Sequence, residues 1–334
     1  MYRKLVFDGV LFSFILSVFV FSTILRMDED SMNLTLLSIV TVSLFLVGMG
    51  SSYFLSRRRI LTLGGVLFEP NSTASGVWYK SLWAWQLVLA LLVAFVMAFV
   101  KTGFSFIELF DENGFAGAMR LFQGIADPNW NILPKAVYNI IETVFMAFLA
   151  TALAIPPAFV LSFFCAQNIM KSPGARLIYI FLRTGLNITR SIEALIWAII
   201  FSVWVGIGPF AGMLALMIHS IASLAKQFSE MVEASEEGPV EAITSTGASK
   251  LQIVWYAIVP QVLLPYISFI VYRWDINVRM ATVIGLVGGG GIGTMLVQYQ
   301  GQAMWREVGC IIAVIAVVVW ALDQASAHIR DALK

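Results

Sequence analysis

Long apolar runs, separated by short basic or glycine-rich segments, are the feature that most constrains how this chain can fold. Several runs approach the roughly 20 residues that a helix needs to cross a hydrocarbon layer of about 30 Å. Of the 334 residues, 59% are hydrophobic and 12% are charged, whereas an average soluble domain has about a quarter charged residues. We therefore predict an all-α polytopic membrane protein embedded in the lipid bilayer. The net charge of +1 gives no basic surface for nucleic acid.

The apolar runs predict about eight membrane spans. Their expected positions are residues 10–25, 34–55, 82–100, 137–164, 191–205, 210–228, 260–284 and 308–322. Basic residues concentrate in alternate connections, and this bias places both termini inside the cell. The predicted inside segments contain Arg3, Lys4, Arg57, Arg58, Arg59, Lys80, Lys171, Arg176, Arg183, Arg190, Lys226, Lys250, Arg330 and Lys334, and the outside segments contain Arg26, Lys101, Arg120, Lys135 and Arg306.

The spans divide the chain into three regions. Residues 1–100 are expected to hold three N-terminal spans, and residues 137–334 a five-helix core. The intervening residues 101–136 form an external loop, in which 114–125 is either a short helix at the membrane interface or ordinary loop. The Gly, Asn, Ser and Thr-rich residues 61–80 are predicted to be a cytoplasmic loop. Both cysteines, Cys165 and Cys310, lie in apolar surroundings and are expected to be buried free thiols.

One polar segment between two apolar runs, residues 235–260, is predicted to form two helices joined by a sharp turn. Pro239 suits the first helical position, because its missing N–H would have no partner there. Glu241 is then expected in the first turn, at the positive end of the helix dipole. Gly247 would end this helix, because a left-handed residue costs little without a Cβ. We call this segment the polar hairpin.

The second helix of the polar hairpin has its own start and stop signals. Ser249 and Gln252, three residues apart, form the pattern of a capping box. This helix is expected to stop before Pro260, because the residue that precedes a proline is disfavoured in the helical conformation. The span of residues 260–284 would follow directly.

This spacing resembles the cytoplasmic coupling loop of the permease subunits of ABC importers, known as the EAA motif. Glu241, Ala242, Gly247 and Pro260 match that motif, whereas Ile243 replaces its second alanine. Four further segments are similar, in order, to the phosphonate-uptake subfamily of these permeases. They are residues 191–198, 206–212, 272–279 and 285–293, and the resemblance extends from about residue 101 to the C-terminus.

The resemblance implies a type I ABC importer fold in the bacterial inner (plasma) membrane. A second copy, or a paralogue, would pair with the chain around a central path, and each polar hairpin would dock onto one subunit of an ABC ATPase dimer. A periplasmic phosphonate-binding protein would deliver phosphonate, phosphite or phosphate. ATP and Mg would be bound by the ATPase, so this chain would hold no cofactor, metal or catalytic residue. Its sequence contains no phosphate-binding loop of the form G-x-x-x-x-G-K-[ST].

The predicted span 260–284 contains several polar and charged residues, which are costly inside a membrane and usually face the bundle interior. Asp275 and Arg279 are four residues apart and are expected to pair on one helix face. Arg273 points elsewhere, and Asn277 lies between them in sequence. Two interpretations remain open: these charges lock the span against a neighbouring helix, or Arg273 faces the path and attracts a passing oxyanion.

Other polar residues near the path are weaker candidates. Arg190 and Glu193 would either pair at an inner gate or anchor the chain at the interface. His219 is expected to form a hydrogen bond between helices. The pattern G-x-G-x-x-G at Gly288 to Gly293 lacks the flanking strand of a dinucleotide site, so close helix packing is favoured there.

Two other classes of protein fit the sequence less well. A secondary transporter driven by an ion gradient would show inverted internal repeats with broken helices, and the sequence shows no such repeat. An intramembrane enzyme would need a nucleophile–base pair or a set of metal ligands at span depth, and two isolated histidines fit this poorly.

Overall fold

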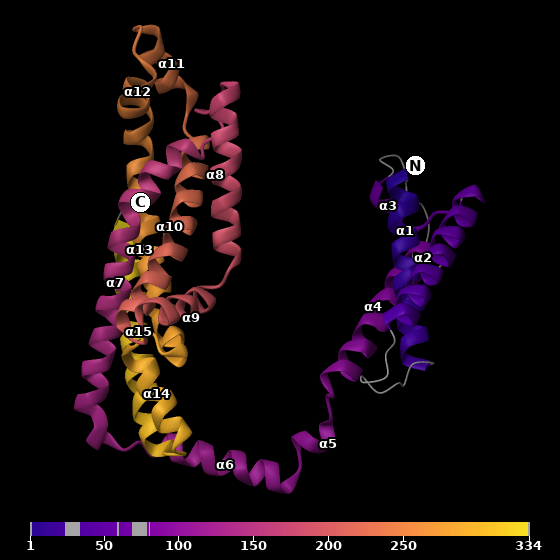
Figure 1. Ribbon diagram of the computed structural model, residues 1–334, viewed down its shortest axis with the longest axis horizontal. Coiled ribbons are helices and arrows are strands. Elements are labelled where there is room, and N and C mark those ends of the chain that lie inside the picture. The colour runs from indigo at the N-terminus through magenta and orange to yellow at the C-terminus, as the bar shows by residue number, and fades with distance from the viewer. Residues whose placement is uncertain (1, 24–33, 59, 69–78, 80, 333–334) are drawn as a thin grey trace. The chain divides into compact units, whose positions relative to one another are not determined.

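The computed structural model describes residues 2–23, 34–58, 60–68, 79 and 81–332 (Figure 1). Every regular element in these ranges is helical. The chain forms two compact units, Met1–Gly114 and Phe115–Lys334, and their boundary falls within the predicted external loop 101–136. Four basic residues of the charge analysis, Arg26, Arg59, Lys80 and Lys334, lie outside the described residues, as do residues 69–78 of the predicted loop 61–80.

Six stretches in the described ranges are long and apolar enough to cross a membrane, or seven if one bent helix pair is a single span. The six are Ile39–Arg57, Leu82–Phe99, Trp130–Phe164, Pro209–Glu233, Lys250–Val287 and Trp305–Ala332. They correspond to six of the eight predicted spans, and the bent pair corresponds to a seventh. The first predicted span falls on α1 (Tyr2–Thr23), which is a helix but is not among the six, so its crossing of the membrane stays a prediction.

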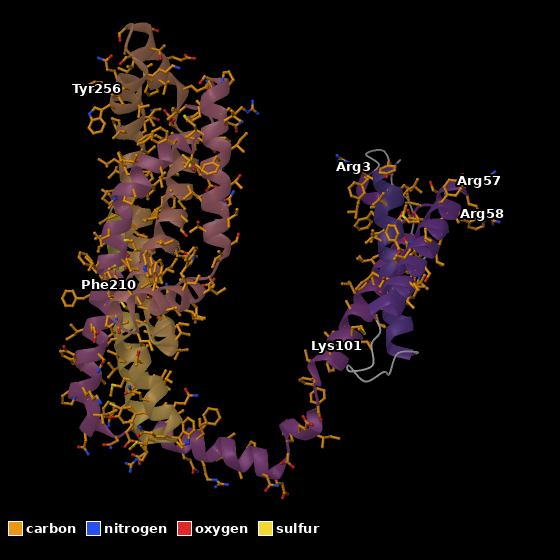
Figure 2. All side chains as sticks on the ribbon, viewed as in Figure 1. Arg3, Arg57, Arg58, Lys101, Phe210 and Tyr256 are labelled. Atoms are coloured by element: carbon orange, nitrogen blue, oxygen red, sulfur yellow. The ribbon has the colours of Figure 1, made fainter. Side chains whose placement is uncertain are left out.

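In the first unit, α1 packs against α2 (Leu34–Arg57) through small residues. A Cβ on Gly48 would lie 2.5 Å from the carbonyl oxygen of Gly9, so the two backbones approach as only small residues permit. The Ser52 hydroxyl donates to the Leu5 carbonyl at 2.9 Å. Figure 2 shows Arg3, Arg57 and Arg58 at one end of this unit and Lys101 at the other, which agrees with the predicted charge bias.

The predicted cytoplasmic loop 61–80 contains a short helix, α3 (Leu63–Phe68), which the sequence analysis missed. Its first turn is held by a buried acid, because Asp8 accepts hydrogen bonds from the Thr62 hydroxyl and from the Gly64 N–H at 2.8 Å. Gln86 of α4 (Leu82–Thr102) accepts from the Leu63 N–H at 2.9 Å. Two side chains from distant helices therefore satisfy backbone donors that local sequence signals leave unpaired.

After the four-residue helix α5 (Phe106–Leu109), the chain forms α6 (Glu112–Ala126). The helical alternative for residues 114–125 is therefore confirmed, while its place at a membrane interface stays a prediction. The C-terminal end of α6 packs closely on the start of α15 (Trp305–Ala332). A Cβ on Gly309 would lie only 2.4 Å from the Ile125 carbonyl oxygen.

The second unit is built on two long helices, α7 (Leu133–Phe164) and α10 (Pro209–Glu233), that pack along their length (Figure 1). Alanines four residues apart on α7 are fully buried, and small side chains of this kind let membrane helices approach closely. They include Ala150, which lies in one apolar cluster with Ala215 of α10, and Ala154 and Ala158, which lie in another with Ala225 of α10. Pro156 and Pro157 lie within α7, which continues as one helix through them.

The predicted span 191–205 differs from the structure. Its residues form α9 (Ala194–Val205), whose 12 residues rise about 18 Å, well short of a bilayer core of about 30 Å. The preceding helix α8 (Pro173–Ser191) is bent from α9 by 90°. Only the bent pair together is long enough to span, and α8 runs beside α10 while α9 crosses the bundle (Figure 1).

The glycine-rich segment joins α13 (Val259–Ile284) to α14 (Gly291–Gly301) through one short turn, Gly285–Val287. A Cβ on Gly290 would lie 2.5 Å from Pro209, and one on Gly212 would lie 2.5 Å from the Gly289 carbonyl oxygen. The predicted close-packing role of these glycines is confirmed. The segment fixes the junction of α13 and α14 against the start of α10.

Candidate functional site

The polar hairpin stands at one end of the second unit (Figure 1). Its first helix, α11 (Glu237–Ser245), begins two residues earlier than predicted. Pro239 is therefore the third helical residue and Glu241 lies in the second turn, so the predicted position of each residue within the helix was wrong. The reason is tertiary: the N–H of Glu236, the residue that caps α11, donates to the Gln261 side chain of α13 at 2.9 Å. Pro239 is still tolerated, because N–H groups of a first turn have no helical acceptor.

The turn of the polar hairpin follows the sequence prediction. Gly247 has a φ of +78°, in the left-handed region that favours glycine. The second helix is α12 (Lys250–Ile253), and the predicted capping box is present. In it, Gln252 accepts from the Ser249 N–H at 2.8 Å and from the Ser249 hydroxyl at 2.9 Å.

The expected stop before Pro260 was wrong. The helix continues from α12 through a wide π-helical segment, Val254–Ile258, directly into α13, so that Pro260 is the second residue of α13. Proline cannot donate the usual helical hydrogen bond, and a wider turn immediately before it absorbs the mismatch. Figure 2 shows Tyr256 of this segment pointing away from the bundle. The polar hairpin is thus continuous with a membrane span.

The surface of α11 is available for contact. Pro239, Glu241 and Ala242 are all exposed, and the last two match the EAA motif. Val240 packs inward against the cluster of apolar residues that joins α7, α10 and α13. One face of the helix is therefore fixed to the bundle while the other remains open to a partner.

Within the span, Arg273 is at the centre of a buried polar network, which we call the Arg273 cluster: Thr151, Ser220, Arg273 and Asn277. Asn277 is 0% exposed and donates to the hydroxyls of Thr151 and Ser220, at 2.8 Å each. Arg273 is 7% exposed and its Nε donates to the Ser220 hydroxyl at 3.1 Å. Its Nη2 has no hydrogen-bond partner among the described residues. A buried cation with a free donor is a site for an acceptor that comes from elsewhere.

The predicted pair on the other face of α13 is present. Arg279 donates to Asp275 and also lies 3.5 Å from Asp323 of α15. Arg279 thereby links α13 to α15, so the locking interpretation is confirmed for this pair. Arg273 also contacts a neighbouring helix, through Ser220 of α10, and its role in the path stays a prediction.

The remaining predicted residues gather around the α8–α9 bend. Glu193 occupies the position just before α9, where its charge interacts with Arg273 and with the His219 ring. The His219 Nδ1 is buried and has no hydrogen-bond partner in the described residues. No ion pair between Arg190 and Glu193 is formed within the described ranges, so a paired inner gate does not form there.

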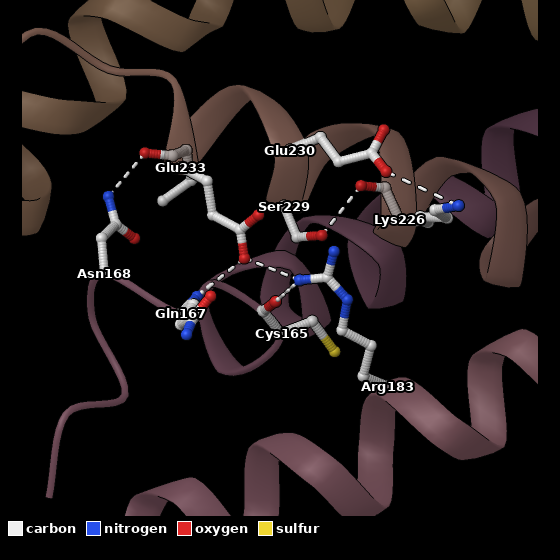
Figure 3. A network of polar contacts seen from close by, with 9 residues as sticks. Cys165, Gln167, Asn168, Arg183, Lys226, Ser229, Glu230 and Glu233 are labelled. Atoms are coloured by element: carbon white, nitrogen blue, oxygen red, sulfur yellow. Dashed lines mark hydrogen bonds and ion pairs between the residues drawn. The ribbon is translucent and has the colours of Figure 1, made fainter. Parts of the chain in front are cut away.

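Sequence reasoning missed a second polar network, at the base of the polar hairpin (Figure 3). Glu233, the last residue of α10, accepts from Arg183 of α8 at 2.6 Å and from the Gln167 N–H at 2.8 Å. It also missed Tyr266, whose hydroxyl donates to the Phe228 carbonyl at 3.0 Å and whose ring stacks on Phe228. The partners are 38 to 66 residues apart, and only the fold brings them together.

Comparison with known proteins identifies the family to which this chain belongs. The family model described as binding-protein-dependent transport system inner membrane component matches residues 138–324, which include the polar hairpin and the Arg273 cluster. The chain belongs to this family. It is accordingly a transport subunit with several membrane spans in the plasma membrane, and it works with an ATPase and a substrate-binding protein.

Relatives and solved structures agree with this family. The chain is 33% identical to the phosphite transport system permease protein PtxC of Stutzerimonas stutzeri over 72% of this chain and 88% of that protein. It is 45% identical to the putative cryptic phosphonate transport system permease protein PhnE2 of Escherichia coli, over 35% of this chain and 97% of that protein. A chain of the MetNI methionine ABC transporter superposes with a TM-score of 0.54 at 22% identity, over 62% of this chain and 99% of that chain. The fold is that of a type I ABC importer permease.

Proposed function

We propose that this permease imports phosphonate or a related phosphorus oxyanion, phosphite or phosphate, by an ATP-driven mechanism. The match of residues 138–324 to the transport family carries the proposal. The substrate class is supported by the relatives that are named for phosphite and phosphonate transport. The permease would recognise all three oxyanions by their negative charge, because each has a tetrahedral phosphorus with negatively charged oxygens.

We further propose that two copies of the permease form the path and that each polar hairpin docks onto a separate ATPase subunit. The exposed face of α11, with Pro239, Glu241 and Ala242, supports this contact. ATP and Mg would be bound by the ATPase, and this chain would hold no cofactor. In the described residues, no group of three His, Cys, Asp or Glu side chains is placed to bind a metal ion.

The Arg273 cluster is the part of the path that we assign to the substrate. Its guanidinium is oriented by Ser220 and retains a free nitrogen, and guanidinium groups bind phosphate-type oxygens with two directed hydrogen bonds. Glu193 provides a nearby negative charge that would weaken retention of an anion. A path site needs this balance, because a substrate that binds too tightly is not released.

The proposal is tested in proteoliposomes that contain the permease, its ATPase and ATP, supplied with the binding protein from outside. Uptake of radiolabelled phosphonate, phosphite and phosphate should require ATP and the binding protein. Uptake that needs an ion gradient and no ATP would instead support a secondary transporter. If none of the three oxyanions were taken up, the proposed substrate class would be refuted and the family assignment would stand.

The docking contact is tested by Glu241→Lys. Glu241 is exposed on α11 and does not support the fold, so the variant should insert normally. We expect it to reduce copurification of the ATPase by at least about tenfold, which corresponds to about 1.4 kcal/mol. Lys250→Gln on α12 is the matched exposed control. Unchanged ATPase recovery with Glu241→Lys would show that α11 is not the docking helix.

A further inference from the structure

The network at the base of the polar hairpin connects three separate parts of the chain (Figure 3). Arg183, on α8, donates through one nitrogen both to the Glu233 carboxylate at 2.6 Å and to the Cys165 carbonyl at 3.1 Å. Glu233 also accepts from the Gln167 N–H at 2.8 Å. Arg183 thus joins the middle of α8 to the end of α7 and to the end of α10. We call Arg183 and Glu233 the clamp.

The clamp lies next to the helix that we assign to the ATPase. Glu233 ends α10, and α11 begins four residues later at Glu237. Asn168 donates to the Val232 carbonyl at 2.8 Å, which further holds the end of α10. The side chains of Arg183 and Glu233 are only 25% and 26% exposed, so solvent screens this pair less than a surface ion pair. A displacement of the polar hairpin would therefore also displace α8.

At its other end, α8 reaches the proposed path. The 90° bend between α8 and α9 is braced, because the Trp197 indole N–H of α9 donates to the Thr189 carbonyl of α8 at 3.4 Å. Glu193 lies within this bend and interacts electrostatically with Arg273. No residue of α8 is fully buried, and only a half-buried stripe that includes Leu182 and Leu186 lies towards the bundle, with Leu186 packed against the apolar cluster of α10. The helix is therefore held by this narrow stripe, by its ends and by the clamp. A helix held in this way can move as one body.

We propose that α8 is a lever that transmits movement of the polar hairpin, through the clamp, to the α8–α9 bend and Glu193. This inference rests on the proposed function, in which ATP drives the polar hairpin. It adds a second route to the direct connection from α12 through the π-helical segment into α13. When the hairpin is displaced, the lever shifts Glu193 relative to Arg273, so the affinity of the path for an oxyanion changes with the state of the ATPase.

Arginine suits the clamp because its planar group can reach two acceptors at once, which a lysine ammonium does less rigidly. Arg183 and Glu233 act through other residues, so they are positioning residues. Their loss should leave ATP hydrolysis running while separating it from transport. A purely structural pair would instead lower assembly, hydrolysis and transport together.

The test is a double-mutant cycle in the reconstituted complex, with Arg183→Gln, Glu233→Gln and the double variant. Glutamine at 233 keeps an acceptor for the Gln167 N–H, and Arg183→Lys keeps the charge. We expect each single variant to lower the number of oxyanions imported per ATP by about fivefold, and the double variant to be no worse than either, because coupled pairs are not additive. Arg183→Lys should fall between wild type and Arg183→Gln.

Lys226→Gln is the matched control, because Lys226 pairs with Glu230 on the same helix end at 3.6 Å without joining α8. It should transport as wild type does. Additive losses in the cycle, an equal loss in Lys226→Gln, or a parallel fall in hydrolysis, uptake and assembly would each overturn the lever.

A readout that needs no substrate separates this inference from the proposed function. In a Cys165→Ala, Cys310→Ala background, a reporter cysteine at Val203, an exposed residue of α9, is labelled with and without trapped ATP. Native Cys165 must be removed although burial raises the pKa of its thiol, because it lies beside the clamp. The lever predicts an ATP-dependent change in labelling that Arg183→Gln abolishes. If that change persists in the variant, the lever is wrong. If it is abolished while wild type imports no oxyanion, only the proposed function fails.

Discussion

Each of the two units buries a charge in a helical bundle, and they treat that charge differently. In the first unit, Asp8 is 1% exposed and both of its oxygens accept hydrogen bonds, from Thr62 and from Gly64. In the second unit, Arg273 is similarly buried, yet one of its guanidinium nitrogens has no partner within the described residues. Asp8 closes a structural contact, whereas Arg273 retains binding capacity.

This difference is more informative than burial alone. Burying a charged group inside a membrane protein is costly, and hydrogen bonds within the fold offset that cost when every donor or acceptor is paired. A buried charge that keeps a free donor is not fully compensated, which makes it a candidate for contact with a ligand. The family match covers residues 138–324 and so includes Arg273 but not Asp8. We therefore predict that Arg273 serves transport and that Asp8 serves folding.

The largest expected effect is the loss of uptake in Arg273→Ala, and Asp8→Asn is the variant that it is compared with. Hydrogen bonds to charged groups are worth about 1.5–3 kcal/mol, so Arg273→Ala should lower ATP-dependent oxyanion uptake by about ten- to hundredfold. The measurement is uptake per assembled transporter in proteoliposomes. Asp8→Asn, which leaves one acceptor for Gly64 or Thr62, should lower the yield of folded protein and leave uptake per transporter within about twofold. If Asp8→Asn impaired uptake as strongly, the distinction between the two units would fail.

A smaller effect is expected where the helices of each unit meet through glycine. A Cβ at Gly212 or at Gly48 would lie 2.5 Å from a carbonyl oxygen, so Gly212→Ala and Gly48→Ala should each cost about 1–3 kcal/mol of stability. Thermal unfolding in detergent measures this cost, and Gly50→Ala, with nothing within 4 Å, should be neutral. Because Gly212 packs at the α13–α14 junction, its variant should also reduce uptake, whereas Gly48→Ala should not.

The smallest effect concerns the turn of the polar hairpin. Gly247 has open space around it, so Gly247→Ala is opposed only by its left-handed backbone, at about 1–2 kcal/mol. Amide hydrogen exchange in residues 235–260 should therefore quicken by about 5- to 30-fold. Gly238→Ala, in α11 with an ordinary φ, is the control and should slow exchange or leave it unchanged. Equal exchange in both variants would contradict the left-handed role of Gly247.

The features that the sequence predicted are those set by near neighbours along the chain. The left-handed turn at Gly247, the Ser249–Gln252 capping box and the Asp275–Arg279 pair involve residues at most four positions apart, and each is present. The exceptions arise where a distant residue intervenes. Gln261 moved the start of α11 ahead of Pro239, and Asp8 and Gln86 created α3 within a predicted loop.

The candidate site shows the same limit. Arg273 was singled out because a charge in a span is rare, but its partners Ser220 and Thr151 are ordinary residues in an apolar sequence. The clamp was missed because Arg183 and Glu233 are 50 residues apart and each alone is typical of an inner boundary of a span. Contacts between helices decide these roles, and one sequence carries no direct record of them.

The π-helical segment Val254–Ile258 also sets a rotational phase between the polar hairpin and its span. Successive residues of a helix are offset by about 100°, so removing one residue here would swing α11 around the axis of α13 by that angle. The composition and the docking residues would be unchanged, yet their exposed side would face a different direction. Matching between a permease and its ATPase would then depend on how many residues separate motif from membrane, as well as on which residues form the motif.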